Sequence, residues 1–103
     1  MQDTELIAFQ IISAVGAARS AYIEAVHMAR EGDFQRAAKL IARGDEVFHQ
    51  GHDAHMQLLQ RQGEGKKDEM DLLLVHAEDQ LMSAESFKIL AEEFIEVYKQ
   101  IQG

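Results

Sequence analysis

The sequence predicts an all-α protein, a single domain over residues 1–103 folded as a three-helix up-down-up bundle. Its 103 residues contain no proline, and this absence favours long uninterrupted helices. Apolar residues recur at helical spacing through three segments. The one extended polar, glycine-rich stretch is "RQGEGKKD", residues 61–68. Three helices joined by short turns pack as a bundle around one modest core.

The first helix is expected over about residues 4–30, with Asp3 as its N-cap. Its small and apolar residues recur every three or four positions, which indicates one buried stripe. The members of this stripe are Ile7, Ile11, Ala14, Val15, Ala18, Tyr22, Ala25 and Ala29.

The second helix is expected over about residues 34–60, after a break at "REGD" in which Asp33 provides the cap. Gly44 and Gly51 weaken its middle by about 1 kcal/mol each relative to alanine. One apolar phase nevertheless continues across both glycines, so a single helix is predicted. The expected inward stripe is Phe34, Ala38, Ile41, Phe48, His52 and Leu59, with His55 beside it.

The third helix is expected over about residues 69–100, with Asp68 as its cap and Asp71 in a capping-box position. At 100° per residue, His76 and Asp79 fall on its main apolar face, whereas Glu78 falls on the opposite, solvated face. The rest of that apolar face is Leu72, Leu73, Gln80, Ser83, Phe87, Leu90, Ala91, Phe94, Val97, Tyr98 and Ile101.

The start of the third helix is apolar on every side, at residues 72–75. A helix that is apolar all round must be covered all round, and a three-helix monomer leaves one flank of each helix exposed. We therefore expect an interface between subunits around His76.

The composition excludes several classes of function. Eighteen acidic against ten basic residues give a formal charge of −8, so a nucleic-acid partner is not expected. The absence of cysteine excludes thiolate chemistry and disulfides. No segment reaches the roughly 18 to 20 apolar residues that a membrane span needs, so none is expected to insert in a membrane. Because Asp3 and Glu5 replace a basic leader, a cytoplasmic location is predicted.

His76 is the candidate functional residue. Asp79 lies one turn further along the same face, where its charge is costly unless it is paired or bound to a metal ion. Gln80 is close by. The second helix is expected to direct His52 and His55 inward. A purely structural core rarely collects three histidines and an aspartate.

Three functions remain open at this point. A di-iron oligomer is suggested by "EAVH" (24–27) and "EVFH" (46–49), but Glu24, His27 and Glu46 point away from the apolar stripes. A non-catalytic helical interaction module would use the histidines only as interface filling. The third possibility is a phosphocarrier, in which a neutral imidazole attacks a phosphoryl group and holds it as a labile N–P bond.

The motifs resemble those of a known family. "LVHAEDQLM" (74–82) is similar to the "VHAQDHLM" segment of the lactose/cellobiose-type enzyme IIA proteins of the bacterial sugar phosphotransferase system. "GAARSAYIEA" (16–25) resembles the family's "G-x-ARS", and "EGDFQRAAKLI" (31–41) its "GDFxxA". "GHDAH" (51–55) falls where the family has "AHxxQ", and "EEFIEVYKQI" (92–101) resembles its last helix.

The resemblance implies a homotrimer and a role for each site residue. His76 would accept a phosphoryl group on its tele nitrogen from the carrier protein HPr. It would pass the group to a cysteine of the cognate IIB protein, for uptake of a β-disaccharide of the lactose, cellobiose or chitobiose class. Three copies of Asp79 would share one divalent metal ion, Mg²⁺, at the trimer axis. Membrane association would be indirect, through the IIB and IIC components.

The chain departs from the family motifs at three positions near His76. Glu78 and His55 each stand where the motifs have glutamine, and Gln80 stands where they have a second histidine. One hypothesis is that His55 replaces the histidine missing at position 80 and supports the His76 ring together with Gln80 and His52.

Overall fold

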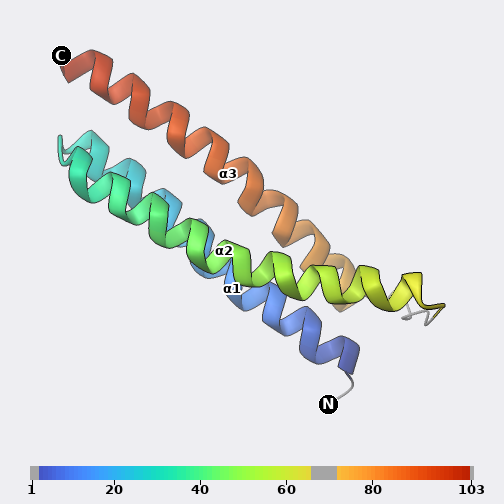
Figure 1. Cartoon of the computed structure of the whole chain (residues 1–103). Helices are drawn as coiled ribbons and strands as arrows, with labels where there is room; N and C mark the ends of the chain where they lie inside the picture. The colour runs from blue at the N-terminus through green and yellow to red at the C-terminus, as the bar shows by residue number, and fades with distance from the viewer. Residues whose placement is uncertain (1–2, 66–71, 103) are drawn as a thin grey trace.

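The structure, a computed structural model, describes residues 3–65 and 72–102 and contains three helices in this part of the chain (Figure 1). They are α1 (Asp3–Arg30), α2 (Phe34–Gly63) and α3 (Leu72–Gln102). The predicted three-helix up-down-up bundle is confirmed. The bundle is elongated, 54 × 21 × 17 Å, and the two termini lie at opposite ends of it, as three alternating helices require.

The turn between α1 and α2 follows the predicted signals. Asp33 caps α2, where its side-chain Oδ1 accepts the backbone N–H of Arg36 at 3.1 Å. Gly32 has a φ of 86°, a left-handed conformation that favours glycine. α2 continues through both Gly44 and Gly51, as expected, and ends three residues beyond the predicted boundary.

Two predicted caps cannot be compared with this fold. α1 begins at Asp3 itself, one residue before the expected start, and the Asp3 side chain lies outside the described part. Asp68 and Asp71 also lie outside the described residues.

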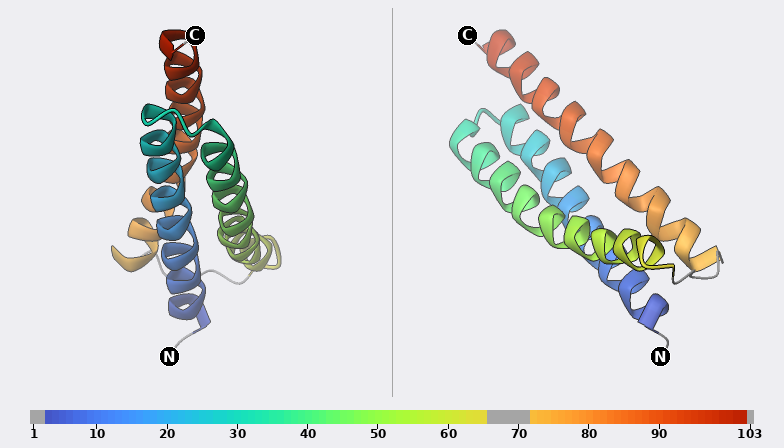
Figure 2. Two further views of the ribbon diagram at one scale, coloured as in Figure 1. Left: turned by 90° about the vertical axis from the view of Figure 1, so that its left-hand side faces the viewer. Right: turned by 45° about the vertical axis from the view of Figure 1, so that its right-hand side comes forward.

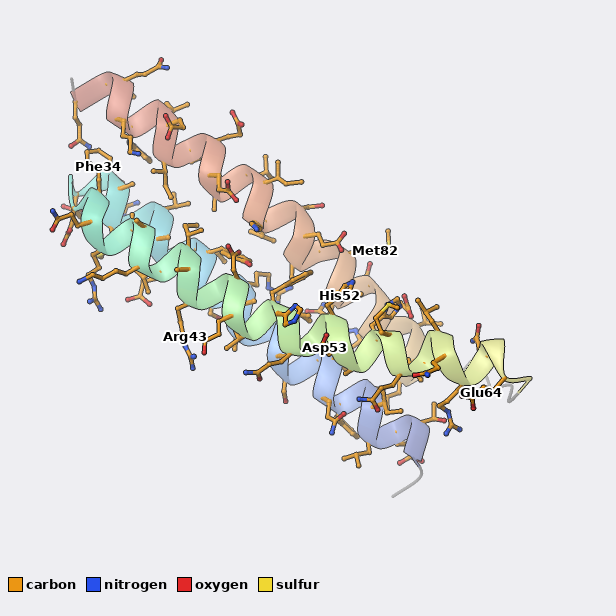
Figure 3. All side chains as sticks on the ribbon, viewed as in Figure 1. Phe34, Arg43, His52, Asp53, Glu64 and Met82 are labelled. Carbon is orange, nitrogen blue, oxygen red and sulfur yellow. The ribbon has the colours of Figure 1, made fainter. Side chains whose placement is uncertain are left out.

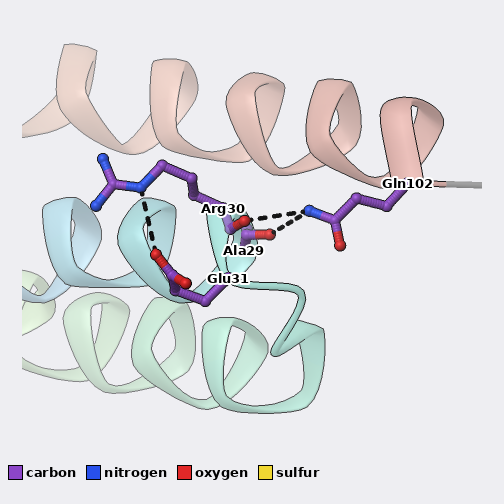
Figure 4. Close-up of polar contacts among 4 residues, drawn as sticks. All are labelled: Ala29, Arg30, Glu31 and Gln102. Atoms are coloured by element: carbon purple, nitrogen blue, oxygen red, sulfur yellow. Dashed lines mark hydrogen bonds and ion pairs between the residues drawn. The ribbon is translucent and has the colours of Figure 1, made fainter.

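The end of α3 is tied to the end of α1. The side-chain amide of Gln102 donates to the backbone carbonyls of Ala29 at 3.0 Å and Arg30 at 3.3 Å (Figure 4). These are carbonyls of the last turn of a helix, which lack intrahelical partners. The same close-up shows Arg30 paired with Glu31 at 3.7 Å.

α1 is the central helix, because it packs along both α2 and α3, whereas α2 and α3 share a smaller contact. In Figure 2, α1 and α2 run side by side and α3 lies behind them. The predicted stripe of α1 is buried at every position except Ala14, which is half-buried. Tyr22, at 0% exposure, is the largest fully buried side chain of the described residues.

By length and mean hydropathy, α1 is apolar enough to cross a membrane, contrary to the expectation from sequence. The fold accounts for this composition in another way. Ile7, Ile11, Val15 and Tyr22 are buried against the other two helices. A core helix that faces two neighbours needs apolar residues around much of its circumference.

The prediction for the inward face of α2 is wrong, because the buried positions are shifted by about one residue from the predicted ones. Ala38, His52 and Leu59 are exposed, and Phe34, Ile41 and Phe48 are only half-buried. The residues that are buried on α2 are Ala37, Gly44, Val47, Gly51, Ala54 and Leu58. Hydropathy alone selects the larger residues, whereas α2 turns its smallest residues to the core.

The physical reason is close approach between α1 and α2. A Cβ atom at Gly44 would lie 2.4 Å from Cε1 of Tyr22, and one at Gly51 would lie 2.7 Å from Cγ1 of Val15. Both distances are shorter than side-chain contacts allow. These glycines are therefore packing sites that permit the helices to meet, and not merely weak points of α2.

The buried face of α3 combines alanine with leucine and isoleucine. Its buried residues are Leu74, Ala77, Leu81, Ala84, Ala91 and Ile95. Most of the face predicted as the main apolar stripe is exposed in the protomer. The large apolar residues of α3 that are exposed are Leu72, Val75, Met82, Phe87, Ile89, Leu90, Phe94, Val97 and Ile101. We call the set Leu90, Phe94, Val97 and Ile101 the outer stripe of α3.

Candidate functional site

His76 lies near the start of α3 and is exposed to solvent. The next residue, Ala77, is completely buried, so the helix presents its core face and its histidine to nearly perpendicular directions. Leu72 and Val75, on the exposed side near His76, are 84% and 48% accessible. The imidazole is therefore accessible, and the apolar residues beside it remain exposed in the part of the protomer that the structure describes.

Asp79 is also exposed and lies one helical turn after His76. No group of three or more His, Cys, Asp or Glu side chains within residues 3–65 and 72–102 is arranged to hold a metal ion. Asp79 thus belongs to no such cluster among the described residues of one protomer. A metal ion bound by Asp79 would take its further ligands from outside this set, for example from other copies of the chain.

Glu78 is not on a solvated face, and the prediction for this residue is wrong. Its Oε1 lies 2.7 Å from Nε2 of His55 on α2, and the pair is half-buried, with side-chain exposures of 39% and 17%. α2 shields this side of α3, since the buried face of α3 is centred on Ala77 and Leu81 and extends round toward Glu78. A carboxylate is only an acceptor, so the His55 Nε2–H donates.

His55 does not support the His76 ring within the protomer. It is engaged with Glu78, which projects from nearly the opposite side of α3. The idea that His55 replaces a histidine missing at position 80 is therefore not supported by this geometry. Gln80 is half-buried and lies one turn after His76 on α3.

His52 is exposed and not directed inward, so this prediction is wrong as well. It stacks on His49, with ring centroids 6.4 Å apart and planes at 11°. His49 in turn lies 3.6 Å from Asp53, and Figure 3 shows His52 and Asp53 next to each other on α2. The error follows from the shifted phase of α2, because Gly51 takes the buried position that was assigned to His52.

The residues considered for a di-iron site do not form one. Glu24, His27, Glu46 and His49 are all exposed, as their helical positions predicted for the first three. Within the described ranges they belong to no metal-ligating group. A di-iron centre needs inward-pointing ligands from four helices, and this arrangement is not present in the protomer.

One polar cluster escaped the sequence analysis. The Tyr22 hydroxyl donates to Oδ1 of Asp45 at 2.8 Å, and Nζ of Lys88 lies 3.1 Å from the same oxygen. These residues join α1, α2 and α3. Burial raises the pKa of Tyr22 well above its ordinary value of 10.0, and the hydrogen bond to Asp45 and the negative charges of Asp45 and Glu92 raise it further. A lone tyrosine in an alanine-rich stripe was the available signal, because a buried phenol requires a partner.

The arrangement around His76 suits a nucleophile that receives a group from another macromolecule. The ring lies on an open helix surface and not in a closed pocket, so small-molecule binding has little enclosure here. A neutral imidazole carries a ring-nitrogen lone pair that is available for bonding. Such a group can exchange a phosphoryl group with a docked partner.

Comparison with known proteins places this geometry in a family. A model of the lactose/cellobiose-specific IIA subunit of the phosphotransferase system matches residues 6–99. The lichenan-specific phosphotransferase enzyme IIA component of Bacillus subtilis (strain 168) is 40% identical, over 97% of this chain and 91% of that protein.

Solved structures agree with the sequence match. The cellobiose-specific enzyme IIA from Bacillus anthracis superposes with a TM-score of 0.96 at 37% identity, covering 99% of this chain and 94% of that one. The IIA(chitobiose) in a complex with HPr, from the N,N′-diacetylchitobiose branch of the Escherichia coli system, gives a TM-score of 0.78 at 26% identity, with both chains fully covered. The chain therefore belongs to the lactose/cellobiose-specific IIA family of the sugar phosphotransferase system.

Proposed function

We propose that this protein is a phosphocarrier in which His76 receives a phosphoryl group from phospho-HPr and passes it to a cysteine of the cognate IIB protein. The observation that carries the proposal is the exposure of His76 on α3 in a chain of the IIA family. The related IIA(chitobiose) is known in complex with HPr, which supports HPr as the donor here. The system would serve a β-disaccharide of the lactose, cellobiose or chitobiose class.

Each transfer exchanges one bond to phosphorus for another. The lone pair of the tele nitrogen of neutral His76 attacks phosphorus while the N–P bond to the HPr histidine breaks, and the HPr nitrogen retains that electron pair. In the second step, the IIB thiolate attacks phosphorus and the His76 N–P bond breaks. Acidic residues near His76 suit a carrier, because a cluster of cations would stabilise the bound phosphoryl group and oppose its onward transfer.

The proposed active form is a homotrimer. The outer stripe of α3 is about half exposed, with Phe94 at 51% and Ile101 at 72%. Ile23 on α1 is also exposed and lines one hollow with Leu90 and Phe94, so the apolar surface continues from α3 onto α1, as at a contact with another protein. Burial of this surface between three copies would also bring α3, and hence His76, to the border between subunits.

Asp79 fits a metal ion only within such an assembly. Its carboxylate oxygens are hard donors of the kind that Mg²⁺ prefers, and Asp79 belongs to no cluster of three or more possible ligands within the described residues of one protomer. Three copies at the trimer axis would hold one ion, which would offset the repulsion between the carboxylates. Chelation should then lower the Tm of wild type. Asp79→Leu should remain trimeric and insensitive to chelator, since apolar packing can replace a buried charge cluster. Monomers in that variant would contradict the axial cluster.

A cytoplasmic location follows from the same proposal, because HPr and the IIB protein act on the inner side of the membrane. α1, although apolar enough to span a bilayer, forms the core of the bundle. Direct membrane insertion would require α1 to leave its packing against α2 and α3. Membrane association would instead be indirect, through IIB and IIC.

Phosphorylation by purified components tests the proposal. With phosphoenolpyruvate, enzyme I and HPr, wild type should be labelled and His76→Ala should not. His52→Ala is the matched control, because His52 is equally exposed but lies on α2, and it should be labelled like wild type. The adduct should be acid-labile, as a phosphohistidine is. Labelling of His76→Ala would overturn the assignment, and an unlabelled wild type would favour a non-catalytic helical module.

A further inference from the structure

The pair formed by His55 and Glu78 joins α2 to the part of α3 that carries His76. The two side chains meet at 2.7 Å and are half-buried. A second ion pair, Asp45 with Lys88 at 3.1 Å, joins the same two helices further along α3. Because α2 and α3 share the smallest contact of the three helix pairs, each such link has a large share in fixing their relative position.

The first described turns of α3 combine apolar packing with this polar link. Leu74 and Ala77 are buried and Leu73 packs against the same core cluster, whereas Leu72 and Val75 are exposed. Glu78 lies about 100° around the helix axis from Ala77, at the edge of the buried face. Its contact with His55 therefore adds a polar link between α2 and α3 directly beside the apolar core.

The helical geometry couples this link to His76. Glu78 follows His76 by two residues, about 200° around the helix axis, with the fully buried Ala77 between them. If α3 rotates about its axis, Glu78 withdraws from His55 and His76 moves by the same angle on the other side. Holding Glu78 against α2 thus fixes the direction in which His76 faces outward.

We propose that His55 and Glu78 are a positioning pair that sets the orientation of His76 for phosphoryl transfer. The inference rests on the proposed function of His76. Neither residue touches the phosphoryl group, and each acts through the rigid turn of α3. Positions 55 and 78 are also two positions at which this chain departs from glutamine in the family motifs, and the structure shows that these two departures are in contact.

Transfer kinetics from phospho-HPr separate positioning from simple stabilisation. His55→Ala and Glu78→Ala should each lower kcat for phosphorylation of His76 on the order of tenfold, the scale of coupling between contacting groups. KM for HPr should change little, because the docking surface remains. The double variant His55→Gln/Glu78→Gln restores an uncharged hydrogen bond between the helices and should recover most of the rate.

Lys88→Ala is the matched control. It removes the other ion pair between α2 and α3 but lies three turns away from His76, and it should lower the Tm without lowering kcat. Equal loss of kcat in Lys88→Ala, wild-type rates in both single variants, or failure of the double glutamine variant to recover would each overturn the positioning role.

Failure of the proposed function is distinguishable from failure of this inference. If wild type accepts no phosphoryl group, then the NMR signals of the His76 ring still report its surroundings. They should move in the two single alanine variants, return toward wild type in the double glutamine variant, and stay fixed in Lys88→Ala. Unchanged ring signals in both single variants would refute the positioning pair independently of activity.

Discussion

The seam between α1 and α2 and the outer stripe of α3 are built from opposite kinds of residue. The seam is formed by small residues, with Gly44 against Tyr22 and Gly51 against Val15. The outer stripe carries leucine, phenylalanine, valine and isoleucine, yet it is about half exposed. The protomer thus uses close approach of helix backbones for part of its own core and leaves a row of large apolar side chains on α3 outside. This division indicates that part of the apolar surface serves contact with other chains.

Gly44→Ala should produce the largest loss of stability among these tests. The new Cβ would lie 2.4 Å from the Tyr22 ring, and overpacking of this kind costs about 1–3 kcal/mol. The gain in helix propensity offsets part of that cost. Urea denaturation of the variant and of wild type, at equal protein concentration, measures the difference. A variant as stable as wild type would show that α2 can move away from α1 without penalty.

Phe94→Asp should break the outer stripe without unfolding the bundle. A carboxylate at the centre of an apolar interface would be desolvated without a partner, so the proposed trimer should dissociate. Sedimentation should then give the 11.6 kDa chain mass, whereas circular dichroism should retain the helical signal. Glu93→Asp is the control, since Glu93 is exposed on the neighbouring side of α3. An unchanged oligomer mass for Phe94→Asp would place the interface elsewhere.

Tyr22→Phe tests the polar cluster that joins the three helices. Loss of the hydrogen bond to Asp45 should destabilise the fold by about 1–2 kcal/mol, and Lys88 should still pair with Asp45. The pKa of Tyr22 is raised in the folded state. Its contribution should therefore be complete below the unfolded pKa near 10 and be lost as pH rises above that value toward the folded pKa.

The measurement is chemical denaturation of both proteins at pH 8 and at pH 11. The stability difference between wild type and Tyr22→Phe should shrink at the higher pH, because only wild type has this tyrosine to ionise on unfolding. Tyr98 is present in both proteins and serves as the internal control. A difference that grows with pH would contradict the raised pKa.

Gly16→Ala should have the smallest effect, and of opposite sign to Gly44→Ala. Apart from the backbone of its own helix and the two adjacent residues, no atom in the part of the chain that the structure describes lies within 4 Å of a Cβ placed at Gly16. Alanine should therefore stabilise α1 by about 0.5–1 kcal/mol through helix propensity. The Phe94→Asp background removes any contribution from assembly to the measured unfolding. Destabilisation in that background would mean that the environment of Gly16 in the protomer is tighter than described.

Much of the fold could be predicted from the sequence because helix signals are local. The absence of proline, the Asp33 cap and the periodic stripe of α1 define three helices without reference to tertiary contacts. The faces of α2 and α3 were harder to assign. A hydropathy pattern weights large residues, and here Ala77, Gly44 and Gly51 face inward while Phe94 and Leu90 face outward.

The candidate site, like the fold, could be predicted only in part from the sequence. His76 and Asp79 could be singled out because titratable side chains on an apolar face need a reason, and both lie on the exposed surface that the proposal requires. His55 was correctly expected to face inward, but its partner Glu78 was not predicted, and His52 and Glu78 could not be placed correctly. Their directions depend on how α2 is rotated against α1 and α3, and that rotation is set by steric fit between helices.

The sequence by itself determined the three helices, their order and the identity of the histidine on which the proposed function rests. Spacing and capping act over a few residues and are therefore legible along the chain. Only the tertiary structure decided that Glu78 meets His55, that Asp45 links Tyr22 to Lys88, and that the glycines of α2 are contact points. These features depend on distances between helices, and such distances follow from the packing of side chains that are far apart in sequence.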